Sequence, residues 1–147
     1  MYGVILMLEI IICDDNKGSA EILRDMLAAN TEDKVSVQCV ESCQQVDHLI
    51  TDKTDVVFMD IILNDANGID YAAELKKRFP LLKIVFITAF MEYCEKIFLA
   101  QPVGFLVKPF KSGSVREVLT LINNSMKPQE ELITLQRSKN SAVQIDA

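Results

Sequence analysis

Four short runs of apolar residues in this chain each end in a charged or hydroxyl-bearing residue. Nearly continuous apolar runs of this length are typical of strands that are buried on both faces of a parallel sheet. The pattern therefore predicts four buried strands. The runs, with the residues that follow them, are residues 8–13 with Asp14 and Asp15, residues 56–59 with Asp60, residues 84–87 with Thr88, and residues 105–107 with Lys108 and Pro109.

A fifth segment, residues 35–40, alternates apolar and polar positions for most of its length. This alternation indicates a strand with one solvated face, so we expect it at an edge of the sheet. Cys39 in this segment and Cys13 in the first run are expected to be small buried apolar residues.

Helical patterns lie between the predicted strands in strict alternation. Asn16 is expected to be the N-cap of the first helix, whose apolar positions 22, 23, 26 and 27 repeat at helical spacing. Residues 42–45 and 114–117 each resemble a capping box, with Ser at the first position and Gln or Glu at the fourth. Further helices are predicted from Gly68 to Phe79 and over residues 92–100.

Five strand-helix units in succession predict an α/β fold with right-handed crossovers. The expected architecture is a flavodoxin-like, doubly wound (βα)5 sandwich. Its parallel five-stranded sheet is expected to have the order 2-1-3-4-5.

The residues that follow the strands are expected to converge, because ligands in such sheets bind just beyond the carboxyl ends of the strands. The converging groups are the carboxylates of Asp14, Asp15 and Asp60, the Thr88 hydroxyl and the Lys108 ammonium. Two carboxylates ~4 Å apart repel by about 4 kcal/mol at an effective dielectric constant near 20. A hard divalent cation relieves this repulsion, and an all-oxygen, partly hydrated site suits Mg²⁺. The sequence thus indicates a site for a divalent metal and a phosphoryl group.

Composition narrows the possible functions. The chain has 147 residues, enough for one domain and a short further segment, and its formal net charge of -6 argues against a nucleic-acid-binding surface. Residues 4–13 are too few for a membrane span and include Glu9, which indicates a core strand rather than a signal peptide. We therefore expect a cytoplasmic protein with its four cysteines reduced and no membrane contact. A zinc site on Cys39 and Cys43 is disfavoured, because His48 is the only histidine.

Taken together, the motifs resemble the receiver domains of two-component response regulators. The resemblance covers roughly residues 8 to 126, so residues 1–126 are predicted to form a receiver domain with its core from about residue 8. It rests on Asp14-Asp15, Asp60 with Gly68 eight positions later, Thr88-Ala89, and the stretch Phe-Leu-Val-Lys-Pro-Phe at 105–110.

The resemblance implies that Asp60 accepts a phosphoryl group from a sensor histidine kinase. It implies that Asp15, Asp60 and the backbone carbonyl of Ile62 bind Mg²⁺ directly, while Asp14 acts partly through water. Such a protein is a signalling switch and not an enzyme, apart from phosphorylating itself from a phosphodonor and losing the group slowly.

The same resemblance assigns roles to the residues after the last two strands. Lys108, with a cis peptide bond to Pro109, would contact the phosphoryl group. Thr88 would sense that group through its hydroxyl, and Phe105 would be the aromatic residue that turns inward when Thr88 moves. Many relatives have tyrosine at the position of Phe105.

Other interpretations stay open at this point. Asp14 and Asp15 could simply cap a helix, and a threonine such as Thr88 is often an ordinary strand residue. The chain could be a pseudo-receiver that acts only as an interaction module, although no acidic or lysine position is missing. It could also be an aspartate-nucleophile phosphatase, although that class would want a second aspartate where Ile62 stands. A flavodoxin-like electron carrier would instead need a phosphate loop rich in Ser, Thr and Gly after the first strand.

More specifically, residues 67–70 and 87–94 look like those of receivers in the LytTR class of bacterial transcription regulators. Residues 127–147 would then be a linker and the truncated start of a DNA-binding domain, with strands at 133–136 and 142–147, although a disordered tail is equally compatible with this composition. DNA would be bound only through the missing C-terminal part.

Two further expectations concern regulation. A homodimer formed on phosphorylation would use the face of the fourth helix, fifth strand and fifth helix, where Tyr93, Ile97 and Phe98 offer apolar surface. Ile62 and Phe90, each two positions beyond a site residue, are apolar and cannot orient an attacking water, so the phosphorylated state is expected to be long-lived.

Overall fold

The computed structural model describes residues 7–32, 34–64, 66–89 and 95–126. Within them, five parallel strands form one sheet in the order β2-β1-β3-β4-β5, which confirms the predicted topology. The strands are β1 (Met7–Cys13), β2 (Lys34–Val40), β3 (Val56–Asp60), β4 (Lys83–Thr88) and β5 (Gly104–Val107). The helices are α1 (Lys17–Ala29), α2 (Cys43–Leu49), α3 (Gly68–Arg78), the 3-10 helix η1 (Glu95–Ala100) and α4 (Ser112–Ser125).

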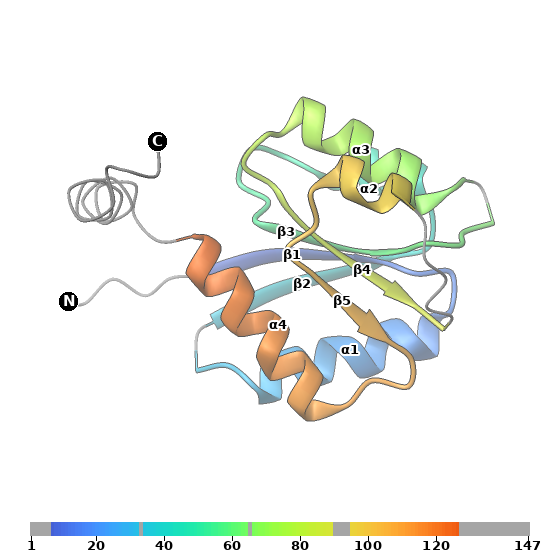
Figure 1. Cartoon of the computed structure of the whole chain (residues 1–147). Helices are drawn as coiled ribbons and strands as arrows, with labels where there is room; N and C mark the ends of the chain where they lie inside the picture. The colour runs from blue at the N-terminus through green and yellow to red at the C-terminus, as the bar shows by residue number, and fades with distance from the viewer. Residues whose placement is uncertain (1–6, 33, 65, 90–94, 127–147) are drawn as a thin grey trace, which may run out of the picture.

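Helices cover both faces of the sheet, with α1 and α4 on one face and α2, α3 and η1 on the other (Figure 1). Each face has its own apolar core, because successive side chains of a strand point to opposite faces. All of β3 is buried, whereas β2 buries only Val40, as expected for an edge strand. No helix among the described residues is long and apolar enough to cross a membrane.

Two of the predicted helix caps are present. The Asn16 side chain accepts a hydrogen bond from the Ser19 amide at 3.0 Å and begins α1. Ser42 accepts one from the Gln45 amide at 3.2 Å and begins α2, while Gln45 Oε1 accepts from the amide of Glu41. These polar caps fix where the chain turns from strand into helix.

The structure corrects the predicted start of the last helix. The capping box at Ser114 is wrong, because α4 begins at Ser112 with Lys111 as an N-cap that makes no side-chain hydrogen bond. The amide of Val115 donates to the Lys111 carbonyl at 3.0 Å, so Ser114 already lies within the first turn. The predicted helix at 92–100 is a 3-10 helix from Glu95, and residues 90–94 lie outside the described residues.

Two expectations about burial are also wrong. Cys13 is buried as predicted, but Cys39 is exposed because β2 is an edge strand and α1 covers it only in part; its thiol donates to the Ala20 carbonyl at 3.8 Å. Ile97 of η1 is buried in the core and adds no apolar surface to the predicted dimer face, whereas the neighbouring Phe98 is 61% exposed. Tyr93 lies outside the described residues.

Candidate functional site

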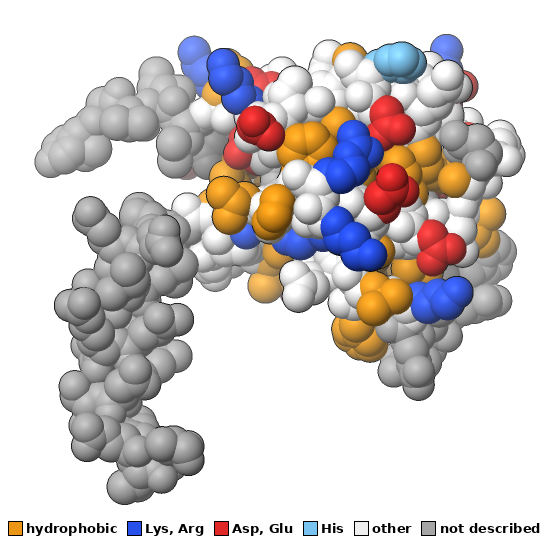
Figure 2. All heavy atoms as spheres, turned by 90° about the horizontal axis from the view of Figure 1, so that it is seen from above, with side chains coloured by type: hydrophobic (Ala, Val, Ile, Leu, Met, Phe, Trp, Pro, Cys, Tyr) orange, Lys and Arg blue, Asp and Glu red, His pale blue; other side chains and the backbone are white. Residues whose placement is uncertain are grey.

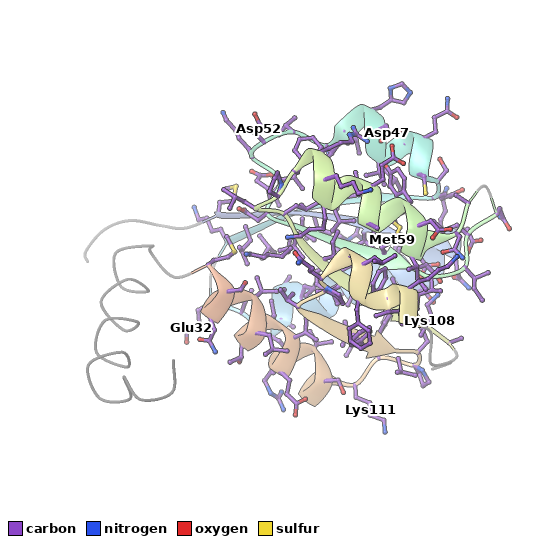
Figure 3. The ribbon with its side chains drawn as sticks, turned by 45° about the horizontal axis from the view of Figure 1, so that its top comes forward. Glu32, Asp47, Asp52, Met59, Lys108 and Lys111 are labelled. Carbon is purple, nitrogen blue, oxygen red and sulfur yellow. The ribbon has the colours of Figure 1, made fainter. Side chains whose placement is uncertain are left out.

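The carboxyl edge of the sheet brings together side chains from four strands. Asp14 follows β1, Asp60 and Thr88 end β3 and β4, and Lys108 follows β5. Asp14, Asp60 and Thr88 are 1%, 6% and 3% exposed, so polar groups occupy a buried position here. Figure 3 shows Lys108 at this edge of the sheet. A buried polar cluster is stable only when its charges are paired.

Lys108 provides that pairing. Its ammonium nitrogen lies 2.7 Å from Asp14 Oδ2 and 3.0 Å from Asp60 Oδ2. The Lys108 amide donates to the Thr88 carbonyl at 2.8 Å, and the peptide bond to Pro109 is cis, as predicted. The lysine therefore lies between two carboxylates that would otherwise repel each other.

The second oxygen of each buried carboxylate is held by the backbone. Asp14 Oδ1 accepts from the Asn16 amide at 2.9 Å, and Asp60 Oδ1 accepts from the Ile62 amide at 3.0 Å. Aspartate side chains commonly bond the amide two residues on in this way. Both carboxylates are thus fixed before any ligand binds.

A third carboxylate completes a possible metal site. One carboxylate oxygen from each of Asp14, Asp15 and Asp60 lies within 4.8 Å of the others, with Asp15 more exposed than its neighbours. Three clustered carboxylates suit a hard cation such as Mg²⁺, so these residues fit the predicted metal. Over the described residues no other cluster of three His, Cys, Asp or Glu side chains could hold a metal, and none includes Cys39 or Cys43.

Burial and pairing shift two acid-base equilibria at this site. Burial raises the pKa of Asp60 above its usual value, although hydrogen bonds from Ile62 and Lys108 lower it, and the nearby charge of Asp14 raises it further. Burial alone would lower the pKa of Lys108, but its contacts with Asp14 and Asp60 raise this pKa above its usual value. Lys108 therefore stays charged at neutral pH, and the surroundings of Asp60 disfavour its ionised form.

The two residues predicted to transmit a signal lie on neighbouring strands. Thr88 is buried at the end of β4, and Phe105 is partly buried on β5. The Phe105 ring stacks on Phe86 with ring centroids 6.1 Å apart and an interplanar angle of 27°. This places Phe105 against the core under α3 and η1, and its role as a switch stays a prediction.

Of the two residues predicted to tune the lifetime of the phosphorylated state, one is described. Ile62 follows the site directly and is 66% exposed, and it pairs with Asn67 through an antiparallel bridge that closes the intervening loop. Its amide points to Asp60, whereas its carbonyl as a metal ligand stays a prediction. Phe90 lies outside the described residues.

The structure shows why residue 68 is a glycine. A β-carbon at this position would lie 2.0 Å from the backbone oxygen of Asp60, far closer than any real contact. The Gly68 amide also donates to the Ile61 carbonyl at 2.8 Å, which holds the start of α3 against the end of β3. The glycine that the sequence marks only by its spacing from Asp60 therefore positions the backbone of Asp60.

Comparison with known proteins agrees with this geometry. The family described as Response regulator receiver domain matches residues 10–120. Sensory transduction protein LytT of Bacillus anthracis is 30% identical over 128 residues, which cover 86% of this chain and 51% of the relative. LytT of Bacillus subtilis is 32% identical over 114 residues, which cover 77% of this chain and 47% of that protein. The chain thus spans about half the length of the curated relatives that it matches.

Solved structures share the fold. A two-component response regulator from Clostridium difficile has a TM-score of 0.70 at 20% identity and covers 82% of this chain and 99% of its own. A response regulator receiver protein from Pseudoalteromonas atlantica has a TM-score of 0.69 at 22% identity and covers 81% and 99%. At these identities the likeness concerns the fold alone.

The contact between Gly68 and Asp60 can be tested by substitution. Gly68→Ala should lower the free energy of unfolding by about 1–3 kcal/mol, because the new methyl group must displace backbone rather than a flexible side chain. Gly113→Ala in α4 is the control, since its nearest neighbour is an Arg116 nitrogen at 3.9 Å, and it should stabilise by up to about 1 kcal/mol. Urea unfolding measures both, and an unchanged stability in Gly68→Ala would contradict the contact.

The raised pKa of Asp60 predicts a pH-dependent effect. Because ionised Asp60 is disfavoured in the folded state, Asp60→Asn should raise the melting temperature at pH 7 without metal by about a few degrees. The difference from the parent should shrink as pH falls through the folded-state pKa of Asp60, since both side chains are then neutral. Calorimetry over this range with a chelator present measures it, and a variant less stable at pH 7 would contradict the assigned shift.

Proposed function

Because this chain belongs to the response regulator receiver domain family, we propose that it is a phosphorylation-activated switch in which Asp60 accepts the phosphoryl group. One observation carries the assignment. Asp60 ends β3, next to the strand that leads to Asp14 and Asp15, and among the described residues it is the only carboxylate outside this pair that lies close to both the pair and the Lys108 ammonium. Phosphoryl transfer requires positioning and neutralisation of charge more than acid-base chemistry, and this arrangement supplies both.

In the proposed reaction a carboxylate oxygen of Asp60 attacks phosphorus, and the bond from phosphorus to the donor breaks. When the donor is a phosphohistidine of a sensor kinase, its imidazole nitrogen leaves with the bonding electrons and takes up a proton. Mg²⁺ held by Asp14, Asp15, Asp60 and the Ile62 carbonyl would supply positive charge to the phosphoryl oxygens. Lys108 supplies a further positive charge beside the acceptor, through its contact with Asp60 Oδ2. The protein gains one phosphoryl group and turns over no substrate beyond its own slow dephosphorylation.

Two residues would then respond to the new group. The buried Thr88 hydroxyl would bond a phosphoryl oxygen that is absent from the resting site, and Phe105 would repack beside it. Lys108 would exchange its contact with Asp60 Oδ2 for one with the phosphoryl group. Such an exchange gives the two states different contacts, which any conformational switch needs.

A homodimer through η1, β5 and α4 is the proposed consequence. Among the described residues, Phe98, Leu99, Val107 and Leu121 on these elements are each more than 40% exposed. An apolar patch beside Thr88 and Phe105 is suited to a contact that forms only after these two residues move. The partner face is the same surface on a second copy, as a two-fold dimer requires.

Residues 127–147 are proposed to be the linker and the start of a DNA-binding domain of the LytTR class. The match to LytT proteins over about half of their length supports this division. DNA contact belongs to that further domain, because this chain is acidic and the face over α2 and α3 intersperses Lys and Arg with Asp and Glu (Figure 2). In this proposal the protein is a transcriptional switch of the bacterial cytoplasm, and a sensor histidine kinase is its phosphodonor.

The acceptor is tested by incubation with Mg²⁺ and a small acyl phosphate, followed by intact mass. The parent should gain the mass of one phosphoryl group, and Asp60→Asn should gain none. Asp70→Asn, an exposed carboxylate in the first turn of α3, is the matched control and should behave as the parent. Continued release of phosphate from excess donor would favour the phosphatase, no adduct in the parent would favour the pseudo-receiver, and an adduct in Asp60→Asn would remove Asp60 from the mechanism.

The lifetime is tested by changing Ile62 and Phe90, the apolar residues that stand two positions beyond Asp60 and Thr88 in the sequence. Ile62→Asn with Phe90→Glu should speed loss of the phosphoryl group on the order of tenfold, because polar side chains can orient an attacking water. The decay of the phosphorylated mass in Mg²⁺ measures the rate. Equal decay in the double variant and the parent would show that these side chains do not control access of water.

A further inference from the structure

A cavity of about 720 Å³ opens at the end of the sheet opposite Asp60. Three segments that are distant in sequence line it: the loop before β3, the turn between α3 and β4, and the end of α4. The cavity shares no residue with the acidic site, because the site residues follow the strands, whereas two of these segments precede strands and the third ends α4. Figure 3 shows Asp52, which lines the cavity, at the opposite end of the sheet from Lys108.

The walls of this cavity are held rigidly. Asp55 joins the starts of three strands, because its backbone and side chain bond Glu9 at 2.8 and 2.9 Å and its carbonyl accepts from the Lys83 amide at 2.9 Å. The Lys76 ammonium donates to the carbonyls of Pro80 and Leu82, both at 2.9 Å, and fixes the turn before β4. The cavity is thus preformed, and a preformed site costs little entropy to occupy.

Its lining combines apolar surface with charges of both signs. The turn before β4 contributes Phe79 to Leu82, of which Leu81 is 86% exposed, and α4 contributes Met126, which is 39% exposed. The loop before β3 contributes the acidic residues Asp52 and Asp55, and the segment from the end of α3 to the start of β4 contributes Arg78 and Lys83. Such a surface suits a peptide with apolar side chains and both charges.

The segment that follows in this chain has that composition. Residues 127–135 read Lys-Pro-Gln-Glu-Glu-Leu-Ile-Thr-Leu, with a basic residue first, two acidic residues next and three apolar residues at the end. They follow Met126 directly, and Met126 itself lines the cavity. Nine extended residues span up to about 30 Å, and a short tether gives an effective concentration in the mM range.

We propose that residues 127–135 dock in this cavity. Side chains of an extended segment alternate in direction, so positions 127, 131, 133 and 135 share one side. Lys127 then faces the acidic side chains Asp52 and Asp55, Glu131 faces Lys83, and Ile133 and Leu135 cover Leu81. The cavity then fixes the chain that leads out of the receiver, at the end of the sheet farthest from Asp60. The proposal needs no phosphoryl group, so it is independent of the acceptor role of Asp60. It places residues 132–135 on the receiver and therefore replaces the strand expected at 133–136.

A photo-cross-linking experiment on residues 1–147 tests this docking. Benzoylphenylalanine is placed at position 133, equal amounts of normal and heavy-isotope chains are mixed and irradiated, and the cross-linked peptides are identified by mass spectrometry. Docking predicts cross-links within one chain to residues 79–82 or Met126. The same probe at position 140, beyond the segment, is the control and should give few of them. Cross-links between chains, or none to the cavity lining, would overturn the proposal.

A second variant separates docking from general stability. Leu81→Ser should lower the yield of the cavity cross-link about tenfold, as expected when one leucine side chain loses its burial. Leu99→Ser is the matched control, because Leu99 is 66% exposed on η1 and away from the cavity, and it should leave the yield unchanged. Both chains should unfold at the parent temperature or slightly below it. An equal yield in Leu81→Ser and the parent would overturn the proposed contact.

Discussion

The Lys108 side chain allows two carboxylates to be buried together at the carboxyl edge of the sheet. The Lys108 ammonium lies within 3.0 Å of both Asp14 and Asp60, in a place where neither carboxylate has much access to water. An unpaired buried charge costs several kcal/mol, so each carboxylate depends on the same lysine. The remaining oxygens are bonded by the amides of Asn16 and Ile62, which fixes the carboxylates in place.

This arrangement suggests how phosphorylation of Asp60 would alter contacts on two neighbouring strands. Lys108, Thr88 and Phe105 lie on or just after adjacent strands β4 and β5, and the Lys108 amide is bonded to the Thr88 carbonyl. A phosphoryl group on Asp60 would bring additional negative charge to the one cation that the two carboxylates already share. In our proposal the lysine and the threonine therefore move together, and Phe105 carries the change to the outer face of β5. Gly68 lets the start of α3 lie directly against the backbone of Asp60.

Much of this could be predicted from the sequence, because strands and their carboxyl ends are local features. The apolar runs predicted the strands, and the flavodoxin-like choice for a doubly wound sheet predicted their order. A lysine that closes an apolar strand is expected to pair with carboxylates, and Lys108 does so. Features that depend on contacts between distant segments could not be predicted. The pattern placed residues 35–40 at an edge, but it does not show how much of β2 is covered by α1, and Cys39 is exposed where burial was expected. Ser114 fits a capping pattern inside a helix that starts earlier. The close contact of Gly68 with Asp60 and the cavity beside Met126 both depend on how separate segments pack together. No local sequence pattern shows this packing.

The central claim is that Lys108 stabilises this fold by neutralising Asp60 together with Asp14. A double-mutant cycle on Lys108→Met and Asp60→Asn, measured by urea unfolding at pH 7 with a chelator, tests it most directly. Lys108→Met should cost about 3–5 kcal/mol in the parent, because it leaves two buried carboxylates unpaired. It should cost at least about 1 kcal/mol less in the Asp60→Asn background, where only Asp14 is left unpaired. An equal cost in both backgrounds would contradict the account.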